Sequence, residues 1–315
     1  AEPVAKAVSA QLGLDEYQMA DAMGLAGYFA PVPCHTKYMN TPNNGAMKFG
    51  AAGWTAQAGV TAALLAQLGE AGDRSVLDGE YGFWAMNGSQ ACDYEGMVAN
   101  LGKDWKILQS KFKSLPCDGI YQSPLRPLME LVRENDLKPD EIDHILVKAE
   151  ANMFCPQFMS TTIENNVDAS MSFPFCVAVA AHLVPVGPAW QKRETIENPS
   201  IQDFMKHKVQ FEVYDYAEET RRQEIEVEHK PYINRRPSYV EIHARGQVFT
   251  RTAEYAKWLS AETPEFNATD DDLITKFHGN PADVFTRTQS DKAVELLMNL
   301  ENVESVKDLM KALTW

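Results

Sequence analysis

The chain has 315 residues, of which 45% are hydrophobic, and a formal net charge of −15. This length suits one large domain or two moderate ones, with enough apolar material for a packed core. The acidic balance argues against binding to nucleic acid or to an anionic membrane surface, because like charges repel. A local cluster of Lys and Arg can still invert the field inside a cleft, so an anionic substrate is not excluded.

The cysteines are odd in number and scattered, and no two of them form a CxxC pair: Cys34, Cys92, Cys117, Cys155 and Cys176. We therefore expect reduced thiols in a cytoplasmic protein, with no zinc site. No apolar run is long enough to cross a membrane, and no secretory signal is visible. The sequence also lacks a P-loop, a dinucleotide fingerprint, a GxSxG elbow and an HExxH helix.

The first 104 residues predict a helical domain. Residues 1–30 have the pattern of two amphipathic helices that separate near Gly13, and Asp15 is placed to cap the second helix. Residues 31–53 follow as a loop rich in proline, asparagine and glycine, and Lys48 lies within it. Glycines let a backbone turn sharply and approach a ligand closely, so this loop is a candidate ligand contact.

A helix of very small residues then extends to about Leu68. Small residues recur on one face at spacings of three or four: Ala52, Ala56, Gly59 and Ala63. Such a thin face packs closely against a neighbouring helix, and Gly69 and Gly72 are expected to end the helix. Residues 85–103 are predicted to be irregular.

From about Trp105 to residue 255 the pattern changes to a mixture of strands and helices. Alternating apolar residues predict strands at 142–149, 209–214, 238–243 and 247–251, and the last two flank a hairpin turn at 244–246. Helices are predicted at 125–135, 175–183 and 201–206, whereas 151–171 is predicted to be irregular. Because strands and helices do not alternate regularly, this segment is predicted to be an α+β unit.

The helical pattern returns in residues 256–315, with helices predicted at 271–279, 291–300 and 303–313. The acidic run 270–272 is expected to cap and charge the first of these. Insertion of one domain into another explains this order simply. The sequence therefore predicts a mostly α protein with an inserted α+β lid: residues 1–104 and 256–315 form the helical domain, and residues 105–255 form the lid.

Five stretches, in one order along nearly the whole chain, have the character of a known family. They are LGLDEYQMADAMGLAG, then MKFGAAGWTAQAGVTAALLAQLG with VLDGEYGF, then FKSLPCDGIYQSPLRPL, ASMSFPFCVAVAAHL and DDLITKFHGN. They resemble the MmgE/PrpD family, which includes 2-methylcitrate dehydratase, cis-aconitate decarboxylase and iminodisuccinate epimerase. The resemblance implies a two-domain architecture with a large helical domain, an inserted α+β lid and a dimer through the helical domain.

The resemblance implies a lyase or isomerase that acts on a small polycarboxylate, most of all a hydro-lyase that dehydrates a 2-methylcitrate-like hydroxy acid. Decarboxylation of a cis-aconitate type and epimerisation of an iminodisuccinate type are the alternatives. Dehydration and epimerisation remove a proton next to a carboxylate. Fixed cations stabilise the charge that develops, and a positioned acid or base moves the proton, so no metal or organic cofactor is required.

The chain also departs from the family pattern. Family members extend further at the N-terminus, so we expect the family's N-terminal part to be missing here. That expectation leads to a second hypothesis. In it, this chain is a half-site or non-catalytic subunit of a hetero-oligomer, and a partner chain supplies the missing helical part. Ala51 stands where the pattern has a histidine. A second motif often has Lys or Arg, then an aromatic residue or His, then Ser, then Tyr, and here it reads Ser170, Met171, Ser172 and Phe175.

Three residues are candidates for the chemistry. By resemblance, Lys48 and Lys113 would hold substrate carboxylates as point charges. The alternatives are an ordinary surface lysine for Lys48 and a solvated strand end for Lys113. His35, in the loop before Lys48, is the candidate proton carrier, and a loop histidine bonded to the backbone is its alternative.

Five further residues are candidates for substrate binding, and each has a structural alternative. Asn43 and Asn44 are placed to donate to a carboxylate, but asparagine also forms turns by itself. Asp118 and Tyr121 follow Lys113 closely, and a turn with the next glycine is the favoured alternative for Asp118. Ser172 is placed either to bond the substrate or to cap the helix that begins at Phe173.

Overall fold

The structure is a computed structural model, and it describes residues 2–30, 39–41, 47–89, 92–230, 232–259 and 263–314. Its contacts divide the chain into two compact units. The first comprises residues 1–38 and 44–108, and the second comprises residues 39–43 and 109–315. Each unit is described by itself. Within the described ranges, no helix combines the length and the apolar character needed to cross a membrane.

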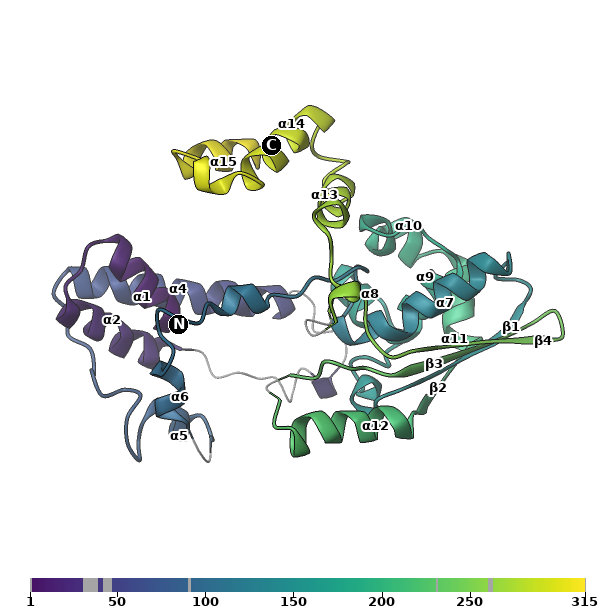
Figure 1. The fold of residues 1–315 in the computed structure, drawn as a ribbon, viewed down its shortest axis with the longest axis horizontal. Helices are drawn as coiled ribbons and strands as arrows, with labels where there is room; N and C mark the ends of the chain where they lie inside the picture. The colour runs from purple at the N-terminus through teal and green to yellow at the C-terminus, as the bar shows by residue number, and fades with distance from the viewer. Residues whose placement is uncertain are drawn as a thin grey trace. The chain divides into compact units, whose positions relative to one another are not determined.

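The first unit is helical (Figure 1). Its helices are α1 (Glu2–Gln11), α2 (Glu16–Phe29), α4 (Met47–Gln67), α5 (Phe83–Met86) and α6 (Tyr94–Val98). Asp15 caps α2 as predicted, since its carboxylate accepts the backbone N–H of Gln18 at 2.9 Å. Helix α5 follows the glycine-rich turn, where a short helix is predicted, whereas α6 lies within residues 85–103, which are predicted to be irregular.

Helices α1, α2 and α4 pack through very small residues. Alanines fill their shared core: Ala5, Ala22, Ala26, Ala62, Ala63 and Ala66. The predicted thin face of α4 is therefore confirmed at Gly59 and Ala63, but Ala52 is exposed. The helix ends as predicted at Gly69, whose φ of 93° only glycine adopts easily, and the backbone N–H of Glu70 bonds back to the carbonyl of Leu65.

The start of α4 corrects one prediction. Lys48 was predicted to lie in a glycine-rich loop, but the helix begins at Met47, so Lys48 lies in its first turn. Gly50 and Gly53 are also helical. The long run of alanine after them favours helix strongly enough to extend it back through these glycines.

The second unit contains helices and one sheet. Its helices are α7 (Gln122–Glu134), α8 (Asn166–Met171), α9 (Phe173–Ala181), α10 (Arg193–Ile196), α11 (Pro199–His207), α12 (Asp215–Arg222), α13 (Asp270–Gly279), α14 (Arg287–Leu297) and α15 (Val306–Ala312), and its strands are β1 (Ile142–Ala149), β2 (Val209–Val213), β3 (Ser238–Ala244) and β4 (Gln247–Ala253). Short 3₁₀ turns lie between them: η1 (Lys106–Gln109, at the junction of the units), η2 (Gly119–Tyr121), η3 (Ala151–Phe154), η4 (Pro188–Gln191), η6 (Pro264–Phe266) and η7 (Leu300–Asn302).

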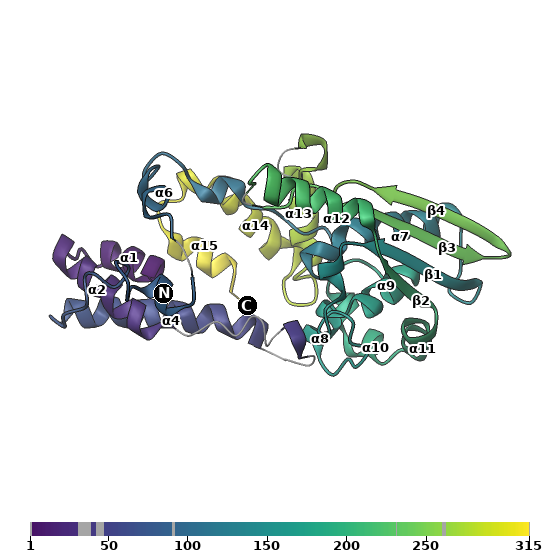
Figure 2. The same ribbon diagram turned by 90° about the horizontal axis from the view of Figure 1, so that it is seen from below.

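The sheet has the strand order β2-β1-β3-β4, which Figure 2 shows from β4 at one edge to β2 at the other. Strand β1 is parallel to β2 and antiparallel to β3. Strands β3 and β4 form the predicted hairpin, with Arg245 and Gly246 in left-handed conformations at its turn. The four predicted strands and the α+β character of this segment are thus confirmed, with ends that differ by one or two residues.

The core of the second unit lies on one face of the sheet. Helices α7 and α9 lie on that side and α12 lies on the other (Figure 1). The core contains large side chains such as Trp190, Phe173 and Phe204. The predicted irregular stretch 151–171 is wrong in part, because Asn165 caps the short helix α8 within it.

Candidate functional site

Residues 110–118 connect η1 to η2 without regular structure, and they carry Lys113. The ammonium group of Lys113 donates to the carbonyl of Cys117 at 3.1 Å, and the Lys113 carbonyl accepts from the ammonium group of Lys276 on α13 at 2.7 Å. Burial lowers the pKa of Lys276, and the positive charge of Lys113 lowers it further. Lys113 is half-buried, so the predicted alternative of a fully solvated strand end is wrong.

A cavity of about 590 Å³ opens beside this segment. It is lined by Lys111, Asp118, Gly119, Ile120, Ile225, Tyr232, Ile233, Arg236 and Leu259. We refer to it as the Arg236 cavity. Its volume lies within the range of small-molecule sites. Two cations and one carboxylate line it, in a chain of net charge −15.

Arg236 precedes β3 and is the most buried cation of this cavity, with 18% of its side chain exposed. It forms an ion pair with Glu150, whose side chain is only 3% exposed. Burial lowers the pKa of Arg236 to about 10, and the charge of Asp118 acts in the opposite direction. The guanidinium therefore stays protonated at neutral pH, and its pairing with the Glu150 carboxylate balances its charge.

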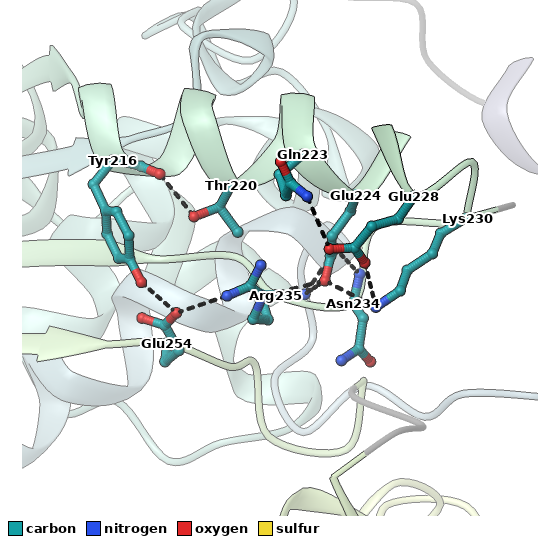
Figure 3. Close-up of polar contacts among 9 residues, drawn as sticks. All are labelled: Tyr216, Thr220, Gln223, Glu224, Glu228, Lys230, Asn234, Arg235 and Glu254. Atoms are coloured by element: carbon teal, nitrogen blue, oxygen red, sulfur yellow. Dashed lines mark hydrogen bonds and ion pairs between the residues drawn. The ribbon is translucent and has the colours of Figure 1, made fainter. Parts of the chain in front are cut away.

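A polar network fixes the wall that carries Arg236 and Tyr232 (Figure 3). Its centre is the fully buried Glu224, in the π-helix η5 (Gln223–Val227) that follows α12. One Glu224 oxygen accepts the backbone N–H of Asn234 at 2.7 Å, and the other forms an ion pair with the guanidinium of Arg235 at 3.3 Å. These bonds tie residues 234–236 to the helix whose Ile225 lines the same cavity.

The outer part of the network extends from Arg235 to α12. Arg235 lies 3.9 Å from Glu254, which accepts a hydrogen bond from the hydroxyl of Tyr216 at 2.8 Å. That bond raises the pKa of Tyr216. On the cavity side, the Lys111 ammonium group lies 4.2 Å from the ring centroid of Tyr232, a cation–π distance. The cavity wall is therefore held by charged contacts on both sides.

Two of the predicted substrate-binding residues, Asp118 and Ser172, lie in different environments. Asp118 lines the cavity, and its carboxylate also accepts the backbone N–H of Ile120 at 3.2 Å, as the turn alternative predicts. Ser172 lies in the core: its oxygen caps α9 through Phe175, and its hydroxyl donates to the carbonyl of Ser160 at 2.6 Å. The structure thus assigns Ser172 the capping role.

Tyr121 is not exposed to the cavity, which corrects its assignment as a substrate contact. Its side chain is fully buried and stacks on Phe173 with ring centroids 4.4 Å apart. Its hydroxyl donates to the carbonyl of Met171 at 2.6 Å, and burial raises its pKa well above the usual value. A hydroxyl in this position cannot reach a ligand without repacking of the core.

The remaining predicted residues belong to other parts of the chain. His35, Asn43 and Asn44 lie outside the described residues, and so does the side chain of Lys48. Within the second unit, His182 bonds to Ala178 and Ser200, and His278 contacts Ser290. The roles predicted for Lys48 and His35 stay predictions.

Sequence reasoning missed Arg236, Glu150 and Glu224. The sequence did contain one signal for Arg236. Pro237 follows it, and a residue before proline disfavours helix, so Arg236 could have been placed in an extended segment directly before the predicted strand. No local pattern pairs Arg236 with Glu150, since the two residues are far apart in sequence. Glu224 lies in the charged run EETRRQEIEVE. Its composition is typical of a solvent-exposed helix, so nothing in it indicates a buried carboxylate.

Comparison with known families also divides the chain into two parts. A model of the MmgE/PrpD N-terminal domain matches residues 3–92, and a model of the MmgE/PrpD C-terminal domain matches residues 115–302. The chain therefore belongs to the MmgE/PrpD family and has its two-domain architecture. The expectation that the family's N-terminal part is missing is not borne out, because the N-terminal model matches residues 3–92. No curated protein matches the chain.

Proposed function

We propose that this protein is a lyase that acts on a small polycarboxylate by removing a proton next to a carboxylate. Family membership supports a dehydratase or lyase class. The observation that carries the proposal is the Arg236 cavity beside Lys113, which two cations line in a strongly acidic chain. The acidic chain as a whole repels a polycarboxylate, so such a ligand binds only where nearby cations reverse the sign of the local electric field.

The proposed reaction is dehydration of a 2-methylcitrate-like hydroxy acid. Epimerisation of an iminodisuccinate type needs the same first step and is one alternative. Decarboxylation of a cis-aconitate type is the other: it breaks a C–C bond, releases CO₂ and takes up a proton. In the first step of dehydration or epimerisation, the electron pair of a C–H bond moves toward a neighbouring carboxylate, which becomes enediolate-like. Lys113 and Arg236 would stabilise the added charge, because cations fixed before the reaction need no reorganisation.

The further roles are extensions of this proposal. Lys48 would hold a second carboxylate, and His35 would carry the proton. Asp118 would orient the substrate from the cavity wall. We also propose that the α+β segment acts as a lid on the helical domain, that two copies associate through the helical domain, and that the protein is cytoplasmic. The described cysteines, Cys92, Cys117, Cys155 and Cys176, form no disulfide among themselves, which supports a reducing location.

The test is a turnover assay of the full chain with 2-methylcitrate, cis-aconitate and iminodisuccinate. Lys113→Met removes the ammonium group and keeps a side chain of similar length. We expect it to lower kcat/KM by about 100-fold, the cost of losing one charge-stabilising group. Lys206→Gln, at an exposed position of α11, is the matched control and should leave turnover unchanged.

Two results would overturn the proposal. Wild-type protein that turns over none of the three substrates would exclude the proposed substrates. Equal turnover by Lys113→Met and wild type would remove Lys113 from the site, and it would leave the Arg236 cavity without its link to the reaction.

A further inference from the structure

A second cavity, of about 500 Å³, lies elsewhere in the second unit. Its charged and aromatic lining consists of Arg126, Lys257, Trp258, Asp271, Asp272 and Lys276. We call it the Trp258 cavity. It shares no lining residue with the Arg236 cavity, although residues 114–116 line it and Lys111 and Asp118 line the other.

Trp258 has an unusual backbone conformation. Its φ is 69°, in the left-handed region that a bulky side chain rarely adopts. Backbone bonds hold it there, since its N–H donates to Phe266 and its carbonyl accepts from Phe112 at 3.1 Å. Strain of this kind persists where the surrounding structure imposes it, and it concentrates at functional sites.

The indole N–H of Trp258 is a buried donor without an acceptor. The side chain is 8% exposed, and Nε1 has no hydrogen-bond partner among the described residues. Buried tryptophan N–H groups usually find a partner, because an unpaired buried donor is costly. An acceptor supplied by a ligand in the cavity would satisfy it.

Three cations surround this donor. The ammonium groups of Lys257 and Lys276 lie 5.6 Å and 6.0 Å from the centroid of the Trp258 ring, and Arg126 lines the same cavity from α7. All three side chains are half-buried, and none forms an ion pair with a carboxylate in the part of the chain that the structure describes. Other half-buried cations of this unit, such as Arg235 and Arg251, do have carboxylate partners.

The carboxylates of the cavity offset these cations only in part. The backbone N–H of Thr269 lowers the pKa of Asp272 most, and the charges of Lys257 and Arg126 help to lower it. Asp271 and Asp272 belong to the first turn of α13, so the lining has three cations and two acids. Asp272 is already used, because its carboxylate accepts the backbone N–H of Thr269 at 3.1 Å and the Thr269 hydroxyl at 2.9 Å. The cavity therefore has an excess of positive charge and one free buried donor.

We propose that the Trp258 cavity is a second anion site, which binds a small carboxylate. A guanidinium presents two parallel donors that match a carboxylate, and the two ammonium groups add point charges. Arg126 would take the carboxylate, Lys257 and Lys276 would neutralise it, and the Trp258 N–H would donate to one of its oxygens. This site does not depend on the proposed lyase reaction.

The test follows the Trp258 indole directly by ¹H–¹⁵N NMR of the full chain labelled at its six tryptophans. The Trp258 peak is the one missing from the spectrum of Trp258→Phe, which keeps an aromatic ring and removes the donor. Addition of citrate at constant ionic strength should shift this peak in a saturable manner. Arg126→Gln and Lys276→Gln should each weaken binding at least tenfold, and the control Lys206→Gln should not.

A Trp258 peak that citrate leaves unmoved would overturn the proposal, and so would equal citrate affinity in Arg126→Gln, Lys276→Gln and wild type. A shift with inorganic phosphate but not with citrate would overturn the carboxylate assignment. If Trp258→Phe does not fold, calorimetric titration of citrate into Lys276→Gln and Lys206→Gln makes the same comparison, and equal affinities contradict the site.

The two proposals fail independently. Lys113→Met removes a group of the proposed reaction but no lining residue of the Trp258 cavity, so the citrate shift should persist in that variant. Turnover with an unmoved Trp258 peak would exclude this site alone. A citrate-dependent shift without turnover of any substrate would exclude the lyase alone.

Discussion

The Arg236 cavity and the Trp258 cavity differ in how their cations are compensated. Arg236 has a buried carboxylate partner in Glu150, and Lys111 lies against the ring of Tyr232. In the Trp258 cavity, Arg126, Lys257 and Lys276 have no ion-pair partner among the described residues. The cations of the Arg236 cavity thus have partners within the protein, whereas the cations of the Trp258 cavity lack ion-pair partners and can bind an anionic ligand. A binding site can therefore be indicated in two separate ways: by side chains held in a fixed geometry, or by charged side chains without partners.

The largest expected effect comes from breaking the support of Arg236. Glu150→Ala should destabilise the protein by about 3–5 kcal/mol, because it leaves a buried charge uncompensated. Urea unfolding measures this change. The double variant Glu150→Gln/Arg236→Met removes both charges and should recover most of the loss. Arg193→Ala breaks an exposed pair and should cost under about 1 kcal/mol. An equally small cost for Glu150→Ala would contradict the buried ion pair.

The matching change in the Trp258 cavity should have a much smaller effect. Lys276→Met removes a half-buried cation that has no carboxylate partner, so stability should change by less than about 1 kcal/mol. Burial lowers the folded-state pKa of Lys276, so wild-type stability should rise relative to the variant as the pH rises through that pKa. Citrate should raise the melting temperature of wild type more than that of Lys276→Met. If Lys276→Met lost as much stability as Glu150→Ala, the proposed difference between the two cavities would be contradicted.

The smallest effect concerns the acid that borders the Trp258 cavity. The backbone N–H and the hydroxyl of Thr269 lower the pKa of Asp272. The carboxylate therefore stabilises the fold above its unfolded pKa of about 4, and this contribution is lost as the pH falls through the lower folded value. The melting temperature of Asp272→Asn should lie below that of wild type at pH 7, and the gap should narrow under acidic conditions. A gap that is independent of pH would contradict the capping role.

Local patterns predicted much of the fold. Alternation identified the strands and the hairpin at Arg245 and Gly246, and cap residues such as Asp15 marked helix starts. The start of α4 was missed because the glycines around Lys48 suggest a loop when the alanines after them are ignored. The lid arrangement and the assignment of residues 256–315 to the helical domain stay predictions.

The candidate site was less predictable than the fold, because its contacts join distant parts of the chain. Tyr121 looked like a cleft residue, but its hydroxyl bonds to a carbonyl 50 residues away. Arg236 and Glu150 carry no sequence signal of their pairing. Asp118 forms the predicted turn and also lines the Arg236 cavity, and its role toward a substrate stays a prediction.

The central claim is that this chain removes a proton next to a carboxylate with the help of Lys113. Incubation of the full chain in D₂O with 2-methylcitrate, cis-aconitate or iminodisuccinate tests it most directly. Reversible proton removal introduces deuterium from the solvent in the first and third, and decarboxylation takes up a deuteron in the second. Mass spectrometry should find deuterium on the carbon next to a carboxylate, in recovered substrate or in product, with wild type and Lys206→Gln. The rate should fall about 100-fold with Lys113→Met. Incorporation at equal rates in Lys113→Met and wild type, or no incorporation by wild type from any of the three, would contradict the claim.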